Sequence, residues 1–407
     1  MGFEKLVFGK TDVHELLNEF GSPLYVYDEE ILRKRCQEMK SLLTYPQFRV
    51  NYSAKANTNV ELLKIVRSEG LDVDGMSPGE MYLEIKAGFR SDRITFIGNN
   101  VSRNELQFAV DNGILVSVDS LSQLKLLGEI NRGGSVCLRI NPGIGAGHHD
   151  KVITGGKKAK FGIAVEDLPL AQEIAARCEM TISGLNQHIG SLFLEPDAYV
   201  AAAAAILELA AMIRSVETVD LGGGFGIPYR HGVEQRLDLA NLGTQLDTLI
   251  NDWVASHRPI SIRTEPGRYV VAECGALLGT VTAVKENYNT FFVGTDIGFN
   301  TLVRPVMYDS YHEISVVPRE ERPYEEYSKP VYVVGQICES GDILAHDRVI
   351  PCCHEGDALI VHDAGAYGFS MASTYNSRPL PAEVLIEKDG TIRLIRKAQT
   401  LQDLWPD

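Results

Sequence analysis

From about residue 48 the chain alternates between two kinds of segment. Short apolar or β-branched runs predict strands, and each is followed by a longer stretch whose apolar residues recur at helical spacing. This alternation is typical of a parallel sheet, and eight such strands in about 220 residues fit a closed (β/α)8 barrel, with an open doubly wound sheet as the alternative. The predicted strands are residues 48–54, 71–76, 94–98, 114–118, 136–140, 182–188, 218–221 and 260–264. The predicted helices are residues 60–68, 79–87, 105–112, 121–129, 168–177, 199–213 and 239–254.

A different pattern begins after about residue 274. Short strand-like runs are separated by turn residues there, and Lys388-Asp389-Gly390 predicts a hairpin turn between the last two strands. We therefore expect an α/β protein in which a barrel of residues 28–275 is followed by a C-terminal β domain, the latter built from residues 1–27 and 276–407. The predicted strands of this domain include residues 279–284, 290–294, 331–334, 358–361 and 382–387.

One long segment within the barrel has no strand or helix pattern. Residues 143–160 lie between the fifth and sixth predicted strands, are rich in glycine and contain His148, His149 and Asp150. Two interpretations stay open, a mobile cover over the mouth of the barrel and a plain surface loop.

Composition and charge narrow the classes of function. The chain has 407 residues, with 39 Lys and Arg against 54 Asp and Glu, and a formal net charge of −15. A surface this acidic repels nucleic acids and anionic membranes, so we expect neither as a partner. The most apolar stretch, residues 199–213, is interrupted by Glu208 and is too short to span a bilayer. Seven irregularly spaced cysteines do not resemble a disulfide scaffold, which favours a reducing cytoplasm as the setting.

Three polar residues lie at or near the ends of predicted barrel strands, where catalytic side chains collect. Lys55 closes the first strand, Asp74 lies near the end of the second and His188 ends the sixth. A partly desolvated lysine amine is suited to form a Schiff base, with Asp74 as its charge partner; otherwise Lys55 is simply a residue that reaches water. His188 is either functional or a hydrogen-bonded core residue. No second histidine lies at ligand spacing from it, so we expect no metal site.

The last two strands carry groups suited to an anion. The seventh leads into Gly222, Gly223 and Gly224, which predict either a phosphate-binding backbone or merely a tight turn. A dinucleotide fingerprint is disfavoured, because the glycines come late and a proline follows soon after them. The eighth strand ends in Glu265-Pro266-Gly267-Arg268, whose charges alone would indicate no more than a surface ion pair. Together with Lys55, these groups predict pyridoxal 5'-phosphate as the cofactor.

Seven motifs in one order make the chain resemble the pyridoxal-phosphate-dependent decarboxylases with an alanine-racemase-like barrel, most closely the branch that acts on diaminopimelate. The resemblance extends from about residue 20 to about residue 396. The motifs are Tyr52-Ser53-Ala54-Lys55-Ala56-Asn57, His188-Ile189-Gly190-Ser191, Gly222-Gly223-Gly224-Phe225-Gly226, Glu265-Pro266-Gly267-Arg268, Arg304-Pro305 with Tyr308, Cys338-Glu339-Ser340-Gly341-Asp342, and Gly365-Ala366-Tyr367-Gly368.

The resemblance implies cofactor-binding roles for these residues. Lys55 would hold the cofactor aldehyde with Asp74 nearby, and His188 would stack on the pyridine ring. Glu265 would keep the ring nitrogen protonated, which makes the ring a full electron sink and favours decarboxylation over racemisation. The residues implied around the phosphate are Ser191, Gly223, Gly224, Gly267, Arg268 and Tyr367.

The resemblance also gives Cys338 a role that its own sequence position does not indicate. By itself Cys338 is best interpreted as a small buried residue, whereas the resemblance implies that it protonates the α-carbon after carbon dioxide leaves. In the families that this chain resembles, the segment matching Cys338-Glu339 reaches into the neighbouring subunit's site. The resemblance therefore implies a homodimer with shared active sites.

The implied reaction is decarboxylation of meso-diaminopimelate to L-lysine. The distal end of this substrate carries a carboxylate and an ammonium group, for which arginine forks, tyrosine hydroxyls and a glutamate are suitable partners. The residues implied in substrate binding are Arg268, Arg304, Tyr308, Glu339 and Tyr367.

Three residues and one segment depart from the family pattern; the segment, Ile297-Gly298-Phe299-Asn300, varies the usual sequence ahead of Arg304. Pro78 stands where glycine is usual, Asn186 where histidine is common and Leu192 where a polar residue is common. None of these changes removes a catalytic group. Two alternatives stay open: a decarboxylase of a related or carrier-bound amino acid in a specialised pathway, and a non-catalytic relative that binds the cofactor.

Overall fold

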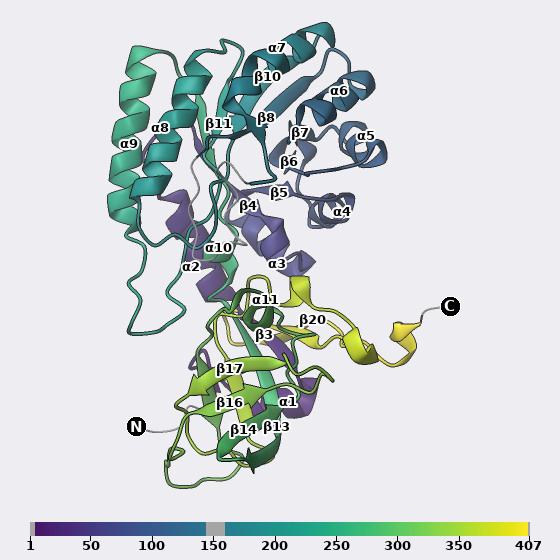
Figure 1. Cartoon of the computed structure of the whole chain (residues 1–407), viewed down its shortest axis with the longest axis vertical. Helices are drawn as coiled ribbons and strands as arrows, with labels where there is room; N and C mark the ends of the chain where they lie inside the picture. The colour runs from purple at the N-terminus through teal and green to yellow at the C-terminus, as the bar shows by residue number, and fades with distance from the viewer. Residues whose placement is uncertain (1–4, 144–158, 406–407) are drawn as a thin grey trace. The chain divides into compact units, whose positions relative to one another are not determined.

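The computed structural model describes residues 5–143 and 159–405 (Figure 1). These residues form two compact units. The barrel unit comprises Arg33–Ile227 and Gln235–Val270, and the β unit contains the rest of the described chain, including the excursion Pro228–Glu234. The two interpretations of segment 143–160 concern residues 144–158, which lie outside the described residues.

The barrel unit contains a closed ring of eight parallel strands. Its order is β10-β11-β12-β4-β5-β6-β7-β8, and pairing of β8 with β10 closes the ring, with Ser135 opposite Thr181. The predicted (β/α)8 barrel is therefore confirmed, and the open doubly wound alternative is wrong. A short strand, β9 (Ile163–Ala164), pairs with β8 outside the ring. The ring strands are β4 (Phe48–Ser53), β5 (Asp72–Gly75), β6 (Ile94–Phe96), β7 (Leu115–Val118), β8 (Ser135–Asn141), β10 (Thr181–Asn186), β11 (Thr218–Asp220) and β12 (Ser261–Thr264).

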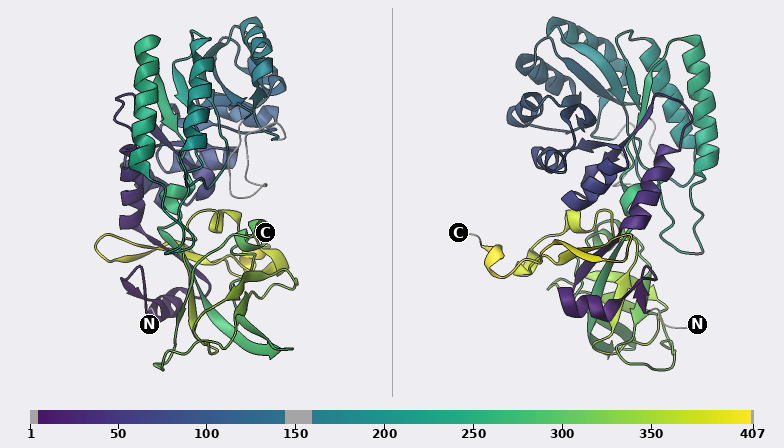
Figure 2. Two further views of the ribbon diagram at one scale, coloured as in Figure 1. Left: turned by 60° about the vertical axis from the view of Figure 1, so that its left-hand side comes forward. Right: turned by 180° about the vertical axis from the view of Figure 1, so that it is seen from behind.

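Helices cover the outside of the strands (Figure 2). Seven of them match the predicted helical stretches, with ends that differ by two residues at most. They are α3 (Val60–Ser68), α4 (Pro78–Lys86), α5 (Arg103–Asp111), α6 (Leu121–Ile130), α7 (Leu168–Arg177), α8 (Asp197–Ala211) and α9 (Leu239–Ser256). Pro78 is well placed as the first residue of α4, because a helix start needs no backbone N–H there, and Ser77 caps the helix by accepting from the Glu80 N–H at 3.2 Å.

Helix α2 (Glu29–Lys40) was not predicted, because charged residues dominate it. Its barrel-unit part contacts the end of α3 through Arg33 Nη1 and Glu69 Oε1, 2.6 Å apart. It also contacts the four-residue helix α10 (Arg268–Val271), where Tyr269 Oη donates to Glu38 Oε2 at 2.9 Å. None of the helices in the described residues is both long and apolar enough to cross a membrane.

The β unit is organised by the long strand β13 (Gly275–Asn287). Its first half pairs with β3 (Leu24–Asp28) and β18 (Ala358–Val361), and its second half pairs with β14 (Thr290–Thr295). The predicted strands and the C-terminal hairpin are confirmed. Strand β3 was missed because all five of its residues are buried, which removes the polar–apolar alternation of a half-exposed strand. The remaining strands of its sheets are β15 (Ile314–Val317), β16 (Val331–Val334), β17 (Ile343–Arg348), β19 (Ala382–Ile386) and β20 (Ile392–Arg396).

Candidate active site

The predicted residues of the barrel unit lie on one arc of its rim. They follow or end strands β10, β11, β12, β4 and β5, which are consecutive neighbours around the ring. Because the strands are parallel, their carboxyl ends open on the same mouth. The residues on this arc are Lys55, Asp74, His188, Ser191, Gly223, Gly224, Glu265, Gly267 and Arg268.

Lys55 lies in a short 3₁₀ turn (Ala54–Ala56) directly after β4. Beside it, Asp74 is fully buried on β5 and accepts a hydrogen bond from Ser53 Oγ at 3.0 Å. Burial raises the pKa of Asp74 to about 8, while the charge of Lys55 acts in the opposite direction. Lys55 likewise opposes the rise in the pKa of Glu265. The lysine amine therefore lies close enough to interact with two buried carboxyl groups.

His188 is held as a neutral imidazole just beyond the end of β10. The backbone N–H of Gly223 donates to its Nδ1 at 3.1 Å, so a proton on the neutral ring belongs on Nε2. Burial lowers the pKa of His188 well below its usual range, and the positive charges of Lys55 and Arg139 lower it further. A neutral aromatic ring in this position is compatible with stacking on a flat cofactor.

Glu265 is the most distinctive group on the arc. Asn186 Nδ2 donates to its Oε1 at 3.0 Å, and both residues are buried. Burial, together with the nearby carboxyl groups of Asp220 and Asp74, raises the pKa of Glu265 well above its usual range. Burying a carboxylate is costly unless a cation accompanies it, and a protonated pyridine nitrogen is such a cation. The buried Glu265 carboxyl group, held by Asn186, thus fits the ring nitrogen of pyridoxal phosphate.

The glycines after β11 are required by close backbone packing. An ideal Cβ on Gly223 would lie 2.0 Å from the carbonyl oxygen of Glu265, and one on Gly224 would lie 2.4 Å from that of Gly190. Gly224 also has φ of +104°, which other residues rarely adopt. The tight-turn interpretation therefore has a structural basis whether or not a phosphate binds there.

A substitution at Gly223 should disturb this packing. We expect Gly223→Ala to push the β11 loop away from Glu265 and to weaken cofactor binding about tenfold or more, because the added methyl group meets backbone atoms that cannot rotate aside. Equilibrium titration of the apoprotein with cofactor, followed by absorbance, measures the effect. Gly79→Ala on α4 is a matched control, since Gly79 does not have a positive φ and an ideal Cβ there makes only an ordinary contact, 3.7 Å from Ser77 Oγ. Unchanged affinity in Gly223→Ala would contradict the expectation.

Two loops of the arc are joined by side chains. Arg268 Nη2 donates to Ser191 Oγ at 3.0 Å and so links the segment after β12 to the segment after β10. Gly267 packs against the start of the Lys55 turn, with an ideal Cβ only 3.1 Å from the Cβ atoms of Ser53 and Ala56. Of the predicted phosphate residues of the barrel, Gly267 thus lies beside the Lys55 turn, and Arg268 and Ser191 are joined to each other.

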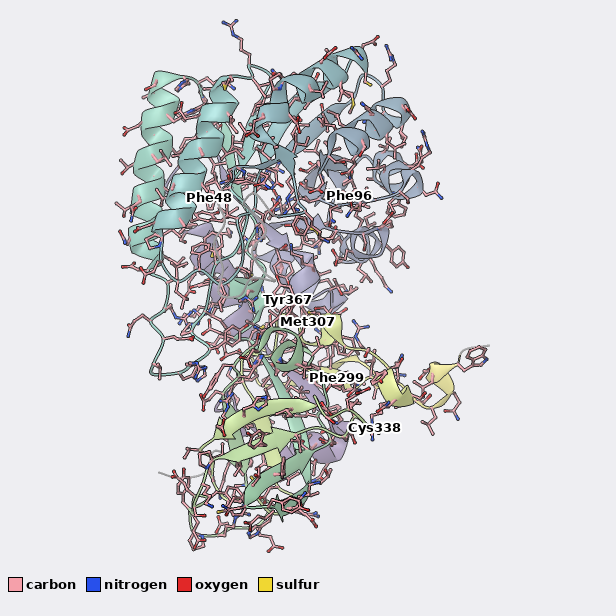
Figure 3. The ribbon with its side chains drawn as sticks, in the orientation of Figure 1. Phe48, Phe96, Phe299, Met307, Cys338 and Tyr367 are labelled. Atoms are coloured by element: carbon pink, nitrogen blue, oxygen red, sulfur yellow. The ribbon has the colours of Figure 1, made fainter. Side chains whose placement is uncertain are left out.

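The other predicted residues belong to the β unit. Cys338 is exposed, so its interpretation as a small buried residue is wrong (Figure 3). Its backbone N–H donates to Asn376 Oδ1 at 2.8 Å, and Glu339 Oε1 accepts from Tyr375 Oη at 2.6 Å. Asp342 shapes this turn by accepting from the Ile337 N–H at 2.7 Å. The exposed Cys338 thus lies on a turn in which hydrogen bonds hold its own backbone and the Glu339 carboxylate.

Arg304 opens helix α11 (Arg304–Tyr308) and is buried. Its Nη1 donates to His312 Nε2 at 2.7 Å, and its Cζ lies 4.6 Å from the centroid of the Tyr229 ring. Tyr308 and Tyr367 are half-buried, and Tyr367 has a left-handed backbone with φ of +56°.

Sequence reasoning gave no role in the site to four polar residues that contact or influence the predicted ones. Asn186 binds Glu265 and ends β10, where a strand-end rule would have found it. Burial raises the pKa of Asp220 to about 6, and this carboxylate accepts from the Gly222 N–H at 2.9 Å. Nothing in the local sequence marks Arg139 on β8 or His312 as a site residue. Arg139 influences His188, which is distant in the chain, and His312 contacts Arg304 across a turn without a regular pattern. Within the described residues no group of three or more His, Cys, Asp and Glu is placed to hold a metal ion.

Comparison with known proteins identifies the class. The family model described as "Pyridoxal-dependent decarboxylase, pyridoxal binding domain" matches residues 29–272. The chain belongs to this family of pyridoxal-dependent decarboxylases, and the predicted family and cofactor are confirmed.

Relatives and solved structures that are similar to the chain include diaminopimelate decarboxylases. The enzyme of Methanothermobacter thermautotrophicus is 42% identical over 98% of this chain and 94% of its own length, and that of Escherichia coli is 36% identical over 95% and 93%. The M. jannaschii enzyme in complex with L-lysine superposes with a TM-score of 0.87, at 32% identity over 97% of this chain and 93% of its own. The predicted likeness to diaminopimelate decarboxylases is confirmed.

Proposed function

We propose that this protein decarboxylates meso-diaminopimelate to L-lysine and carbon dioxide. The observation that carries the proposal is the placement of Lys55 at the barrel mouth, within electrostatic reach of the buried carboxyl groups of Asp74 and Glu265. An amine, a ring-nitrogen partner and a neutral stacking ring are the groups that pyridoxal chemistry needs from a protein. The diaminopimelate decarboxylases that resemble the chain over nearly its whole length support this substrate.

When bound, pyridoxal 5'-phosphate supplies the electron sink for the pair left by departing carbon dioxide. Lys55 would hold its aldehyde, with the buried carboxyl group of Asp74 beside the lysine amine. Glu265, oriented by Asn186, would hold the proton on the ring nitrogen, and His188 would supply a neutral ring for stacking. The residues assigned to the phosphate are Ser191, Gly223, Gly224, Gly267, Arg268 and Tyr367.

Substrate selection is assigned to side chains that match the distal amino-acid group. The distal carboxylate suits arginine forks and tyrosine hydroxyls, and the distal ammonium suits a carboxylate. These residues are Arg268, Arg304, Tyr308, Glu339 and Tyr367.

Cys338 is assigned the proton transfer to the α-carbon. Its exposure on an ordered turn supports this role, since the thiol is accessible. We expect Cys338→Ala to lower kcat by about 10²-fold, the usual contribution of a positioned proton donor, while the cofactor still binds. Steady-state kinetics and the cofactor absorbance of the same preparation check both parts. Cys352→Ala, a partly buried cysteine of the same unit, should keep wild-type kinetics, and unchanged kinetics in Cys338→Ala would remove this residue from the mechanism.

We further propose a homodimer in which the β unit, near Cys338 and Glu339, contributes to the interface and to the partner's site. Exposed apolar side chains on the same unit support this: Val306 is 41% exposed, Met307 40% and Tyr375 45%. The test mixes two inactive variants, Lys55→Ala and Cys338→Ala. If sites are shared, half of the randomly mixed dimers carry one intact site, and about a quarter of wild-type activity returns. No recovery, or a monomer by light scattering, would contradict shared sites.

The setting is proposed to be a reducing cytoplasm. All seven cysteines lie in the described part of the chain, and all seven are free thiols. Persisting thiols in this number are typical of a reducing compartment.

A substrate panel tests the proposed function directly. Carbon dioxide release is measured from meso-diaminopimelate, L-lysine, L-ornithine and a carrier-bound diamino acid. Release from meso-diaminopimelate with the highest kcat/KM is expected. A preference for another member of the panel would replace the substrate and keep the reaction, whereas bound cofactor with no release from any substrate would indicate a non-catalytic relative.

A further inference from the structure

The guanidinium of Arg304 is held by a histidine that must be neutral. Arg304 Nη1 lies 2.7 Å from His312 Nε2, and an arginine N–H can only donate, so Nε2 is an acceptor without a proton. His312 Nδ1 lies 2.8 Å from the backbone carbonyl oxygen of His362, which can only accept, so the proton is on Nδ1. Two independent partners therefore require the same tautomer.

Arg304 and His312 are packed tightly by neighbouring side chains. Arg304 and His312 are each only 1% exposed. The ring of Tyr229 contacts both side chains. Arg304 Cζ lies over this ring, 4.6 Å from its centroid, and the His312 imidazole meets it nearly edge-on, at 73° and 5.2 Å between centroids. Ser310 Oγ accepts from Arg304 Nη2 at 3.4 Å. Packing and hydrogen bonds together orient the planar guanidinium.

We infer that His312 is a positioning residue, which orients the Arg304 fork for the distal carboxylate of the substrate. The inference rests on the proposed function, because it is that function which gives Arg304 a carboxylate to bind. His312 does not touch the substrate; it fixes the rotation of the guanidinium about its long flexible side chain, so that less conformational freedom is lost when the ligand binds.

The product provides a probe that does not depend on turnover. L-lysine retains the distal carboxylate of diaminopimelate, whereas cadaverine has the same two amines and carbon chain without any carboxylate. A defect in the orientation of Arg304 should therefore weaken L-lysine binding and leave cadaverine binding nearly unchanged. A general loss of folding or of cofactor would weaken both.

The experiment titrates holoenzyme with each ligand by calorimetry. His312→Leu should bind L-lysine about tenfold more weakly, as expected for loss of one hydrogen bond to a charged group, and cadaverine within about twofold of wild type. His312→Gln, which offers an amide oxygen near the position of Nε2, should bind L-lysine within about threefold of wild type. His14→Leu is the matched control: His14 lies in the same unit and contacts backbone carbonyls of Val317 and Pro318, and its replacement should change neither affinity.

Adding Arg304→Met completes a double-mutant cycle. Arg304→Met alone should lose affinity for L-lysine but not for cadaverine. Adding His312→Leu to Arg304→Met should cause little further loss of L-lysine affinity, because both substitutions act through the guanidinium of Arg304. Equal weakening of both ligands, wild-type L-lysine affinity in His312→Leu, or failure of His312→Gln to restore binding would overturn the inference. Failure of the proposed function has a different signature, since wild-type holoenzyme would then release no carbon dioxide from meso-diaminopimelate.

Discussion

Replacing Lys55 by alanine should abolish decarboxylation and covalent retention of the cofactor. Lys55 is the amine at the end of β4, and its charge opposes the rise in pKa of both Asp74 and Glu265. Without it, no nucleophile on this arc can hold an aldehyde, and the loss of turnover should exceed about 10³-fold. Measurements are carbon dioxide release from meso-diaminopimelate and absorbance of the protein-bound cofactor after gel filtration.

The same variant has an electrostatic consequence in the absence of cofactor. Removing the ammonium group takes away an attraction that favours the ionised carboxylates, so the pKa values of Asp74 and Glu265 should rise further.

Lys160→Ala is the control for the loss of turnover, because Lys160 is an exposed lysine of the same unit. Full turnover by Lys55→Ala would refute the assignment of the site, and equal loss in Lys160→Ala would point to a general effect of removing a lysine.

Glu265→Gln should separate cofactor binding from catalysis. Glutamine keeps an oxygen that can accept from Asn186 Nδ2 but cannot carry the negative charge that holds a proton on the ring nitrogen. We expect the cofactor to remain attached through Lys55 while kcat falls by about 10²–10³-fold, the effect of removing one preorganised electrostatic partner. Steady-state kinetics and the absorbance spectrum of the holoenzyme measure the two properties in one sample.

A second buried carboxyl group serves as the control for this change. Glu84 on α4 is fully buried, and its Oε1 would lie 2.9 Å from an ideal Cβ on Gly75. Burial also raises the pKa of Glu84 well above its usual range. Glu84→Gln should keep kcat within about twofold of wild type, because no cofactor atom is assigned to it. A wild-type kcat in Glu265→Gln would show that the reaction does not use this charge.

Local pattern was sufficient for most elements of the fold. The eight barrel strands and seven helices followed from apolar periodicity, because each buries one face or one stripe against a neighbour. Apolar periodicity did not predict β3, whose residues are buried on both faces, or α2, whose sequence is mostly charged. The ring also needs its first strand in the chain, β4, to pair with its last, β12; Phe48 lies opposite Ile262, so this contact joins segments that are far apart in sequence.

The sequence by itself determined the family, the cofactor and the identity of the rim residues, because motif residues and strand ends are local features. Only the tertiary structure decided which partners these residues have. Asn186 binds Glu265 across 79 positions of the chain, and His312 faces Arg304 across a turn that no periodicity describes. The exposure of Cys338 was also decided there. Such features depend on how strands and turns are brought together in space, and a hydrogen bond between distant residues leaves no trace in the local pattern of either.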